Sequence, residues 1–204
     1  MKKIKCIVFD FGGVISKRQN IKYIKKICRI LNIKLDEFQS LYTQKREDYD
    51  TGLIDAKTYW TKTVNLIGKQ VSQTDFKKII EYDVKSWLDI NDETISYIQS
   101  IKDKSILALL SNMTFDTLQE IGNMYWLDYF NLKIFSCEKK VAKPHPRIYE
   151  ICLEDLNMNP QQILFVDDST ENIIAAQKMG INTIKFTNCH EIREIIENEY
   201  IFIR

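Results

Sequence analysis

Lys5-Cys6-Ile7-Val8-Phe9-Asp10-Phe11-Gly12-Gly13-Val14 is the stretch that decides the fold: an apolar run ends on a carboxylate, and two glycines follow. Such a run is typical of a strand buried on both faces, as in a parallel sheet. Ligands of open α/β sheets bind just beyond the carboxyl ends of the strands, so we expect chemistry at Asp10. Gly12 and Gly13 would let the backbone turn sharply and approach a ligand closely. The alternative is that Asp10 only caps a turn, and the rest of the chain has to decide.

The composition argues against several classes of function. The chain has 204 residues, of which 45% are hydrophobic, and a formal net charge of +1. Lysines and glutamates are interspersed, so we expect no nucleic-acid partner and no anionic membrane partner. No apolar run approaches the roughly 18 residues of a membrane span. The N-terminal run is broken by Lys5 and is too short and too polar for a secretory signal.

The cysteines indicate a reducing compartment. They are five in number, scattered, and form no CxxC pair. We therefore expect reduced thiols in a cytoplasmic protein, and neither a disulfide framework nor a zinc site. For the assembly state we expect a monomer or a weak homodimer. The cysteines are Cys6, Cys28, Cys137, Cys152 and Cys189.

A helical segment interrupts the chain after the first strand. Apolar residues recur there at helical spacing, and no strand pattern lies between the helices. This predicts an inserted four-helix cap over residues 16–87, with a core built from residues 1–15 and 88–204. The four helices are expected over residues 19–32, 35–49, 55–67 and 72–87.

Beyond residue 88, strands and helices alternate, which predicts a doubly wound parallel sheet. With the first strand, this gives an α/β fold with a five-stranded sheet. The four further strands are expected over residues 105–111, 132–135, 162–166 and 182–186. The helices are expected over residues 92–101, 114–121, 144–156, 169–179 and 189–199.

Polar residues follow several of these strands at the same edge of the sheet. Besides Asp10, they are Ser111-Asn112 and Asp167-Asp168, and Lys143 lies in a loop before a helix that starts near a proline. Three carboxylates at one site repel each other unless a cation lies among them. Oxygen ligands of this kind favour Mg²⁺, with water and a phosphate completing the shell. The sequence therefore predicts a magnesium and phosphate site.

Each of these residues also has a plainer interpretation. Ser111-Asn112 could be a helix cap, Lys143 a solvated lysine, and Asp167-Asp168 a double N-cap. A chance coincidence of complementary groups at all these strand ends is much less probable than any single coincidence. The convergence therefore favours a functional site.

Four motifs, in this order and spacing, resemble the haloacid dehalogenase superfamily. The resemblance covers essentially the whole chain, including a helical cap after the first motif. Within the superfamily the sequence looks most like the branch of sugar-1-phosphate phosphatases and the phosphatase domain of soluble epoxide hydrolase. The motifs are DFGGV at 10–14, SN at 111–112, KPHPRIYE at 143–150 and FVDDSTEN at 165–172.

By this resemblance Asp10 is a nucleophile that forms an aspartyl-phosphate intermediate. The same resemblance implies one Mg²⁺ ion and a small phosphorylated substrate, over which the cap helices would close. The remaining roles implied are metal binding by Asp10, the Gly12 carbonyl and Asp168; phosphate binding by Ser111, Asn112 and Lys143; orientation of Lys143 or a metal-bound water by Asp167; and bracing of the loop by Asn172.

One position departs from the superfamily's usual phosphatase pattern. These phosphatases usually carry a second Asp two residues after the nucleophile, as general acid and base, and here that residue is Gly12. General acid–base catalysis is worth about 10²- to 10⁴-fold, or roughly 3–5 kcal/mol of barrier. The loss is tolerable where the leaving group departs easily, as an anomeric hydroxyl or an acyl group does. The sugar-1-phosphate phosphatases of the branch that this sequence resembles also carry Gly at this position.

Two alternatives to a phosphatase stay open at this point. A metal-free 2-haloacid dehalogenase also lacks the second Asp, although such a site has no reason to gather Asp167 and Asp168. A weakly active regulatory or binding protein on the same fold would fit Gly12. His145 could touch substrate or lie exposed in its loop. Four aromatic residues of the cap could line a pocket or form core: Tyr42, Tyr49, Tyr59 and Trp60.

Overall fold

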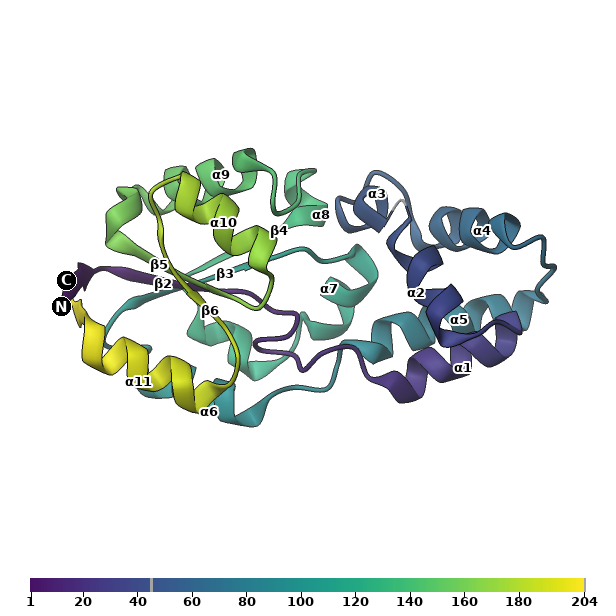
Figure 1. Cartoon of the computed structure of the whole chain (residues 1–204), viewed down its shortest axis with the longest axis horizontal. Coiled ribbons are helices and arrows are strands. Elements are labelled where there is room, and N and C mark those ends of the chain that lie inside the picture. Colours follow the sequence, from purple (N-terminus) through teal and green to yellow (C-terminus); the bar gives the residue numbers. More distant parts are fainter. Residues whose placement is uncertain (45, 204) are drawn as a thin grey trace.

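A computed structural model describes residues 1–44 and 46–203 of the chain. Its centre is a five-stranded sheet in the order β4-β3-β2-β5-β6, and all its strands are parallel (Figure 1). This confirms the predicted α/β fold. The strands are β2 (Cys6–Phe9), β3 (Ile106–Ser111), β4 (Leu132–Phe135), β5 (Ile163–Asp167) and β6 (Asn182–Lys185).

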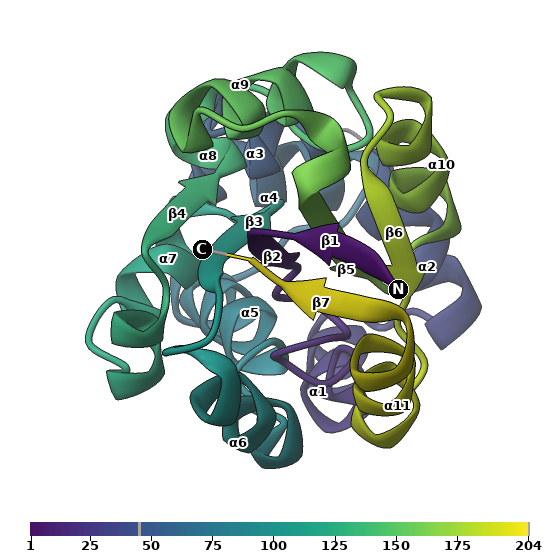
Figure 2. The same cartoon turned by 90° about the vertical axis from the view of Figure 1, so that its left-hand side faces the viewer.

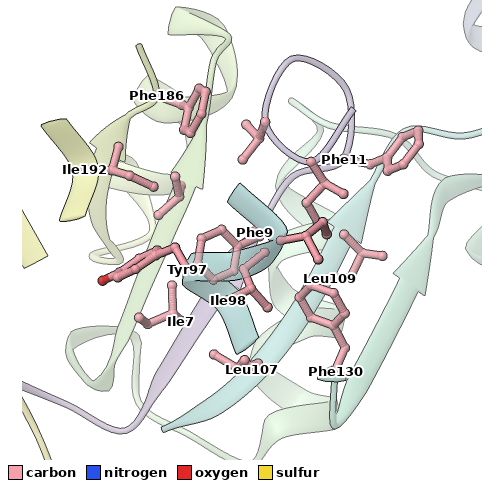
Figure 3. Close-up of a cluster of buried hydrophobic side chains, with 14 of the residues drawn as sticks. Ile7, Phe9, Phe11, Tyr97, Ile98, Leu107, Leu109, Phe130, Phe186 and Ile192 are labelled. Atoms are coloured by element: carbon pink, nitrogen blue, oxygen red, sulfur yellow. The ribbon is translucent and has the colours of Figure 1, made fainter. Parts of the chain in front are cut away.

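Helices cover both faces of the sheet, and the alternation of side chains along the strands explains how. Ile7 and Phe9 point to the face covered by α6 (Asp92–Ile101) and α11 (Cys189–Glu199), and Figure 3 shows them there among other buried side chains. Cys6 and Val8 belong to the opposite cluster, under α9 (Pro146–Leu156) and α10 (Thr170–Lys178). Because both faces are buried, the strands carry continuous apolar runs.

The strand register fixes which residues meet at the carboxyl edge. Phe9 lies beside Leu109 of β3 and Val166 of β5. The Asp10 amide continues the pattern by donating to the Val166 carbonyl at 2.9 Å. Asp10 therefore reaches the level of Asp167, which ends β5.

A group of five helices lies at one end of the molecule, beyond the carboxyl edge (Figure 1). It has its own apolar cluster, which includes the fully buried Ile27, Trp60 and Ile79. In the part of the chain that the structure describes, no residue of 16–87 belongs to the five-stranded sheet. The helices are α1 (Ile21–Leu31), α2 (Leu35–Thr43), α3 (Arg46–Asp50), α4 (Ala56–Leu66) and α5 (Gln73–Ser86).

The expected helix over residues 35–49 was wrong, because two helices occupy this range. Gln44 follows α2 with an extended backbone, at ψ 121°, and α3 begins at Arg46; residue 45 lies outside the described residues. The described helices of this segment therefore number five and not the predicted four. Asp55 and Ser72 cap α4 and α5 by accepting hydrogen bonds from the amides of Thr58 and Asp75.

Other element bounds also differ from the expected ones. The helix expected from Pro144 begins at Pro146, and His145 is its N-cap, whose Nδ1 accepts from the Arg147 amide. Pro at the first helical position costs nothing, because its missing N–H has no partner within the helix. The remaining elements are α7 (Phe115–Ile121), α8 (Ser136–Lys139) and two short 3₁₀ helices, η1 (Tyr125–Tyr129) and η2 (Pro160–Gln162).

The two chain ends form a small parallel sheet that the sequence did not predict. β1 (Lys2–Ile4) pairs with β7 (Tyr200–Phe202), so the first and last strands lie side by side (Figure 2). In β1 only Ile4 is buried, and the two lysines of this strand are exposed. So short and polar a strand gives no apolar run to recognise.

Two expectations about the chain as a whole can be set beside the structure. None of the helices in the described residues has the length and apolar character that crossing a membrane requires. All five cysteines are buried as free thiols. The cytoplasmic location and the assembly state stay predictions.

A buried charge network ties α3 to α5. The Arg46 Nε donates to Asp50 Oδ1 at 2.9 Å, and its Nη1 donates to Asp83 Oδ2 at 2.9 Å. The guanidinium carbon lies 4.5 Å from the ring centroid of Tyr42 and 4.8 Å from that of Tyr49. Only 2% of the Asp83 side chain is exposed, so the pair is desolvated and its loss costs more than that of a surface pair.

Replacing Asp83 tests this network. Asp83→Ala should lower the free energy of unfolding by about 3 kcal/mol, because Arg46 loses the fully buried one of its two carboxylate partners. Glu81→Ala is the matched control on the same helix, since its pair with Lys85 is about half exposed; it should change stability by less than about 0.5 kcal/mol. Urea unfolding measures both variants. Equal losses would contradict the structural role of the network.

Candidate active site

Asp10 lies at the carboxyl end of the central strand, and only 7% of the residue is exposed. Its Oδ1 accepts a hydrogen bond from the Phe11 amide at 2.7 Å. The same oxygen lies 2.6 Å from the Lys143 Nζ. The other carboxylate oxygen has no protein donor among the described residues and is available to a ligand.

Lys143 joins three strands of the site through its ammonium group, which contacts Asp10, Asp167 and the Leu110 carbonyl. It is 4% exposed, and its Nζ donates to Asp167 Oδ2 at 2.8 Å and to the Leu110 carbonyl at 2.9 Å. Its backbone is held by Asn112, whose Nδ2 donates to the Lys143 carbonyl and whose Oδ1 accepts from the Lys143 amide, both at 2.8 Å. The Lys143–Pro144 peptide is cis. The expected convergence of Lys143 with the aspartates is therefore present.

The protonation of Asp10 reflects burial. Burial raises the pKa of Asp10, the positive charge of Lys143 offsets this only in part, and Asp167 raises the pKa as well; the pKa that results is about 8. Burial alone would lower the pKa of Lys143, but the charges of Asp10 and Asp167 outweigh burial and raise it. A cation beside Asp10 would favour its charged form.

Asp167 is the fully buried partner of Lys143. Its Oδ1 accepts from the Ser169 amide at 2.8 Å, and Asn172 Nδ2 donates to both of its oxygens at 3.1 and 3.0 Å. Lys143 also donates to Oδ2, so each of the two carboxylate oxygens accepts two hydrogen bonds. Asp167 is therefore fixed, and it fixes the lysine in turn.

Asp168 is more open than Asp167. Its Oδ2 lies 3.8 Å from the Nε of Arg18, whose side chain is 87% exposed. Burial raises the pKa of Asp168, and the charge of Asp167 adds to this effect. The carboxylate lies against the turn that follows Asp10: a Cβ atom on Gly13 would stand 2.4 Å from Asp168 Oδ2.

The two glycines of the first motif have different roles. Gly13 has a φ of +77°, in the left-handed region that favours glycine. Gly12 lies outside that region, so its backbone conformation does not require a glycine. Both glycines were expected to serve the turn, and the backbone conformation itself favours glycine only at Gly13.

The residues present fit a divalent cation. Carboxylate oxygens of Asp10, Asp167 and Asp168 all lie within 4.8 Å of one another. When these groups are ionised, the buried ammonium of Lys143 and the exposed guanidinium of Arg18 beside Asp168 still leave negative charge uncompensated. An oxygen-only donor set with this charge suits Mg²⁺ better than a softer transition metal.

Ser111 and Asn112 were expected to bind phosphate, and of the two only Asn112 lines the cavity. Asn112 lines the cavity, although its amide is engaged with the Lys143 backbone. Ser111 is buried, and its hydroxyl donates to the Asn112 carbonyl at 3.3 Å. His145 is exposed at the start of α9 and does not line the cavity.

The site opens into a cavity of about 460 Å³ between the sheet edge and the helical segment. Asp10, Lys143 and Asp168 line one side. The other side is lined by residues that belong to no sequence motif. The sequence does not reveal them, because their positions depend on how the helices pack. Of the four aromatics expected either in a pocket or in core, Tyr42 lines this cavity, and the other three are buried within the helical segment. The unpredicted lining residues include Arg18, Gln19, Arg46, Asp50 and Trp87.

Fold and site together define the class of protein, a hydrolase with a doubly wound parallel sheet and its polar groups at the carboxyl edge. The sequence matches the model of the haloacid dehalogenase-like hydrolases over residues 4–180. The chain belongs to this family, as the motifs predicted.

Individual relatives carry different activities. The D-ribitol-5-phosphate phosphatase of Bacteroides thetaiotaomicron is 25% identical, over 94% of this chain and 96% of that protein. A crystal structure of a HAD family enzyme from the same species, in complex with magnesium and inorganic phosphate, is 27% identical with a TM-score of 0.75, and covers 90% of this chain and 94% of that one. The (S)-2-haloacid dehalogenase 4A of Burkholderia cepacia is 33% identical over 39% of this chain and 35% of that protein.

Gly13 gives a test of the carboxylate cluster. Gly13→Ala should abolish stabilisation by Mg²⁺, because the new Cβ would displace the Asp168 carboxylate. Gly180→Ala is the matched control: its φ is +79°, but its Cβ would meet nothing closer than 3.5 Å. Both variants should lose about 1–2 kcal/mol from the positive φ. Only Gly180→Ala should keep the rise in melting temperature with added MgCl₂; an equal rise in both variants would contradict the assignment of Asp168.

Proposed function

We propose that this chain is a Mg²⁺-dependent phosphatase of a small phosphorylated metabolite, a sugar phosphate or a related polyol phosphate. The observation that carries the proposal is the Lys143 ammonium between Asp10 and Asp167, with a third carboxylate beside them. The named phosphatase relative and the magnesium and phosphate complex of a structural relative support it.

In the proposed reaction Asp10 is the nucleophile. Its carboxylate oxygen attacks phosphorus, the bond from phosphorus to the substrate oxygen breaks, and an aspartyl-phosphate forms. Water then attacks the phosphorus and gives up a proton to solvent while the bond from phosphorus to Asp10 breaks, which releases phosphate and restores the carboxylate. Lys143 offsets the negative charge of the phosphoryl group in both steps.

The other residues position these groups. Mg²⁺, held by Asp10, the Gly12 carbonyl and Asp168, would neutralise phosphoryl charge. Asp167 and Asn172 hold Lys143 through the hydrogen bonds described above. Asn112 fixes the Lys143 backbone through its side-chain amide and would offer its backbone N–H to phosphate. The Ser111 hydroxyl would bind a phosphate oxygen after turning from the Asn112 carbonyl.

We further propose that residues 16–87 act as a cap on a core of residues 1–15 and 88–204. Several polar contacts hold the two together, among them the Arg18–Asp168 pair at the cavity and three hydrogen bonds. Tyr49 donates to Asp116 Oδ2 at 2.9 Å, Lys140 donates to the Gly52 carbonyl at 2.9 Å, and Ser136 donates to the Asp50 carbonyl at 2.5 Å. A cap held in this way would exclude water and select the leaving group.

The two alternatives differ in what they require of the site. A metal-free haloacid dehalogenase has no use for the third carboxylate, which only adds negative charge to a site where one buried ammonium already faces two carboxylates. A weakly active binding protein does not require Lys143 to contact the nucleophile at 2.6 Å. A screen of phosphorylated metabolites and 2-haloacids, with and without MgCl₂, separates the three. Phosphate release only with Mg²⁺ supports the proposal, while halide release without metal would overturn it.

Asp168 gives the sharper test of the metal. Asp168→Asn should lower Mg²⁺-dependent phosphate release at least 10²-fold and remove the Mg²⁺-induced rise in melting temperature. Asp155→Asn is the control, since Asp155 pairs with Lys139 at the surface and lies outside the cavity lining; it should keep both properties. Full turnover by Asp168→Asn, or in excess chelator, would contradict the proposed function.

A further inference from the structure

The backbone conformation of Gly12 does not explain why this residue is a glycine. Its φ lies outside the left-handed region, so any residue could adopt this conformation. The space beside it is nevertheless filled, because a Cβ atom on Gly12 would lie 3.2 Å from Cζ3 of Trp87 and 3.7 Å from its Cε3. The neighbour that restricts position 12 is therefore the indole ring of Trp87.

Trp87 is fixed at the junction between the helical segment and the sheet. It caps the C-terminus of α5, where its amide donates to the Val84 carbonyl at 3.0 Å. Its own carbonyl accepts from the Ser16 hydroxyl at 2.5 Å, on the chain segment that enters the helices. Its indole Nε1 donates to the Tyr42 hydroxyl at 3.3 Å. The Trp87 backbone is thus held by α5 and by the entering segment, and its ring is held by Tyr42.

Tyr42 links the indole to the buried charge network. Its hydroxyl also accepts from Gln19 Nε2 at 2.9 Å and donates to Asp83 Oδ1 at 2.7 Å. Trp87 and Gly12 both line the cavity that contains Asp10 and Lys143. The aromatic ring therefore lies where a side chain at position 12 would extend.

We propose that Trp87 is a specificity-determining residue. Its indole ring occupies the space that an acidic side chain at position 12 would need, and the leaving group packs against this ring. The proposal rests on the proposed function. The phosphoryl group passes to Asp10, and the departing oxygen takes its proton from water and not from a side chain at 12. The substrates favoured are those whose leaving group departs readily and offers a flat or apolar face to the indole: anomeric, aryl and acyl phosphates.

A stability cycle tests the contact in the metal-free protein, independently of any activity. Gly12→Ala should lower the melting temperature by about 3 °C, because the methyl group crowds the indole. In a Trp87→Leu background the same change should cost much less. Gly122→Ala is the control, since its Cβ would lie 3.3 Å from a backbone carbonyl, that of Leu118; its cost should be the same in both backgrounds. An equal cost of Gly12→Ala in both backgrounds would overturn the contact.

A kinetic cycle tests the consequence for substrates. Wild type should hydrolyse aryl phosphates at rates that depend steeply on leaving-group acidity, and primary alkyl phosphates slowly. Gly12→Asp alone should be slow with all of them, because carboxyl and indole compete for one space. Gly12→Asp combined with Trp87→Leu should flatten the dependence and raise the alkyl phosphate rate about 10²-fold over wild type. Trp87→Leu alone should raise KM for aryl phosphates more than for acetyl phosphate and leave the steepness unchanged.

The outcomes separate this inference from the proposed function. If wild type and every variant lack Mg²⁺-stimulated hydrolysis, the proposed function fails and the leaving-group role fails with it, while the stability cycle still reports on the contact. If wild type is active and Gly12→Asp alone flattens the dependence as fully as the double variant, the proposed function stands and the role of Trp87 is overturned. Equal KM changes for aryl and acetyl phosphates in Trp87→Leu would overturn it as well.

Discussion

The Lys143 ammonium between the carboxylates of Asp10 and Asp167 is the contact on which the rest of the site depends. A charge buried to this degree is tolerated only with close partners, and Lys143 has two carboxylates and the Leu110 carbonyl. These groups come from three neighbouring strands. The parallel register of the buried strands brings the partners of Lys143 to the same level. The hydrogen bonds of Asn112 with the Lys143 backbone hold the lysine beside them.

The same arrangement makes the site selective for its ligands. One ammonium among three carboxylates leaves negative charge that a divalent cation can balance, and the cation together with Lys143 can then hold a phosphoryl group. The helical segment supplies the opposite wall, where Tyr42, Arg46 and Trp87 are tied into one network. Under the proposed function, the sheet edge would set the chemistry and the helices would select the leaving group.

The sequence predicted the parts that depend on local pattern. Apolar runs located the sheet strands, and residues at their ends, Asp10 and Asp167 among them, met as parallel pairing requires. It missed what depends on packing between distant segments: the break before α3, the paired chain ends, and the Trp87 ring beside Gly12. The contact of position 12 with Trp87 was missed for the same reason, because a glycine that lies against a distant side chain looks identical in sequence to one required by a turn.

The central claim is that Asp10 attacks phosphorus. Acid quench during turnover of acetyl phosphate with Mg²⁺, followed by mass spectrometry of the peptide that contains residues 6–14, tests it most directly. The account predicts a phosphoryl adduct on Asp10 that forms and decays at rates compatible with turnover and is absent from Asp10→Asn. Sustained phosphate release by Asp10→Asn, or turnover in which the adduct lies on another residue, would contradict it.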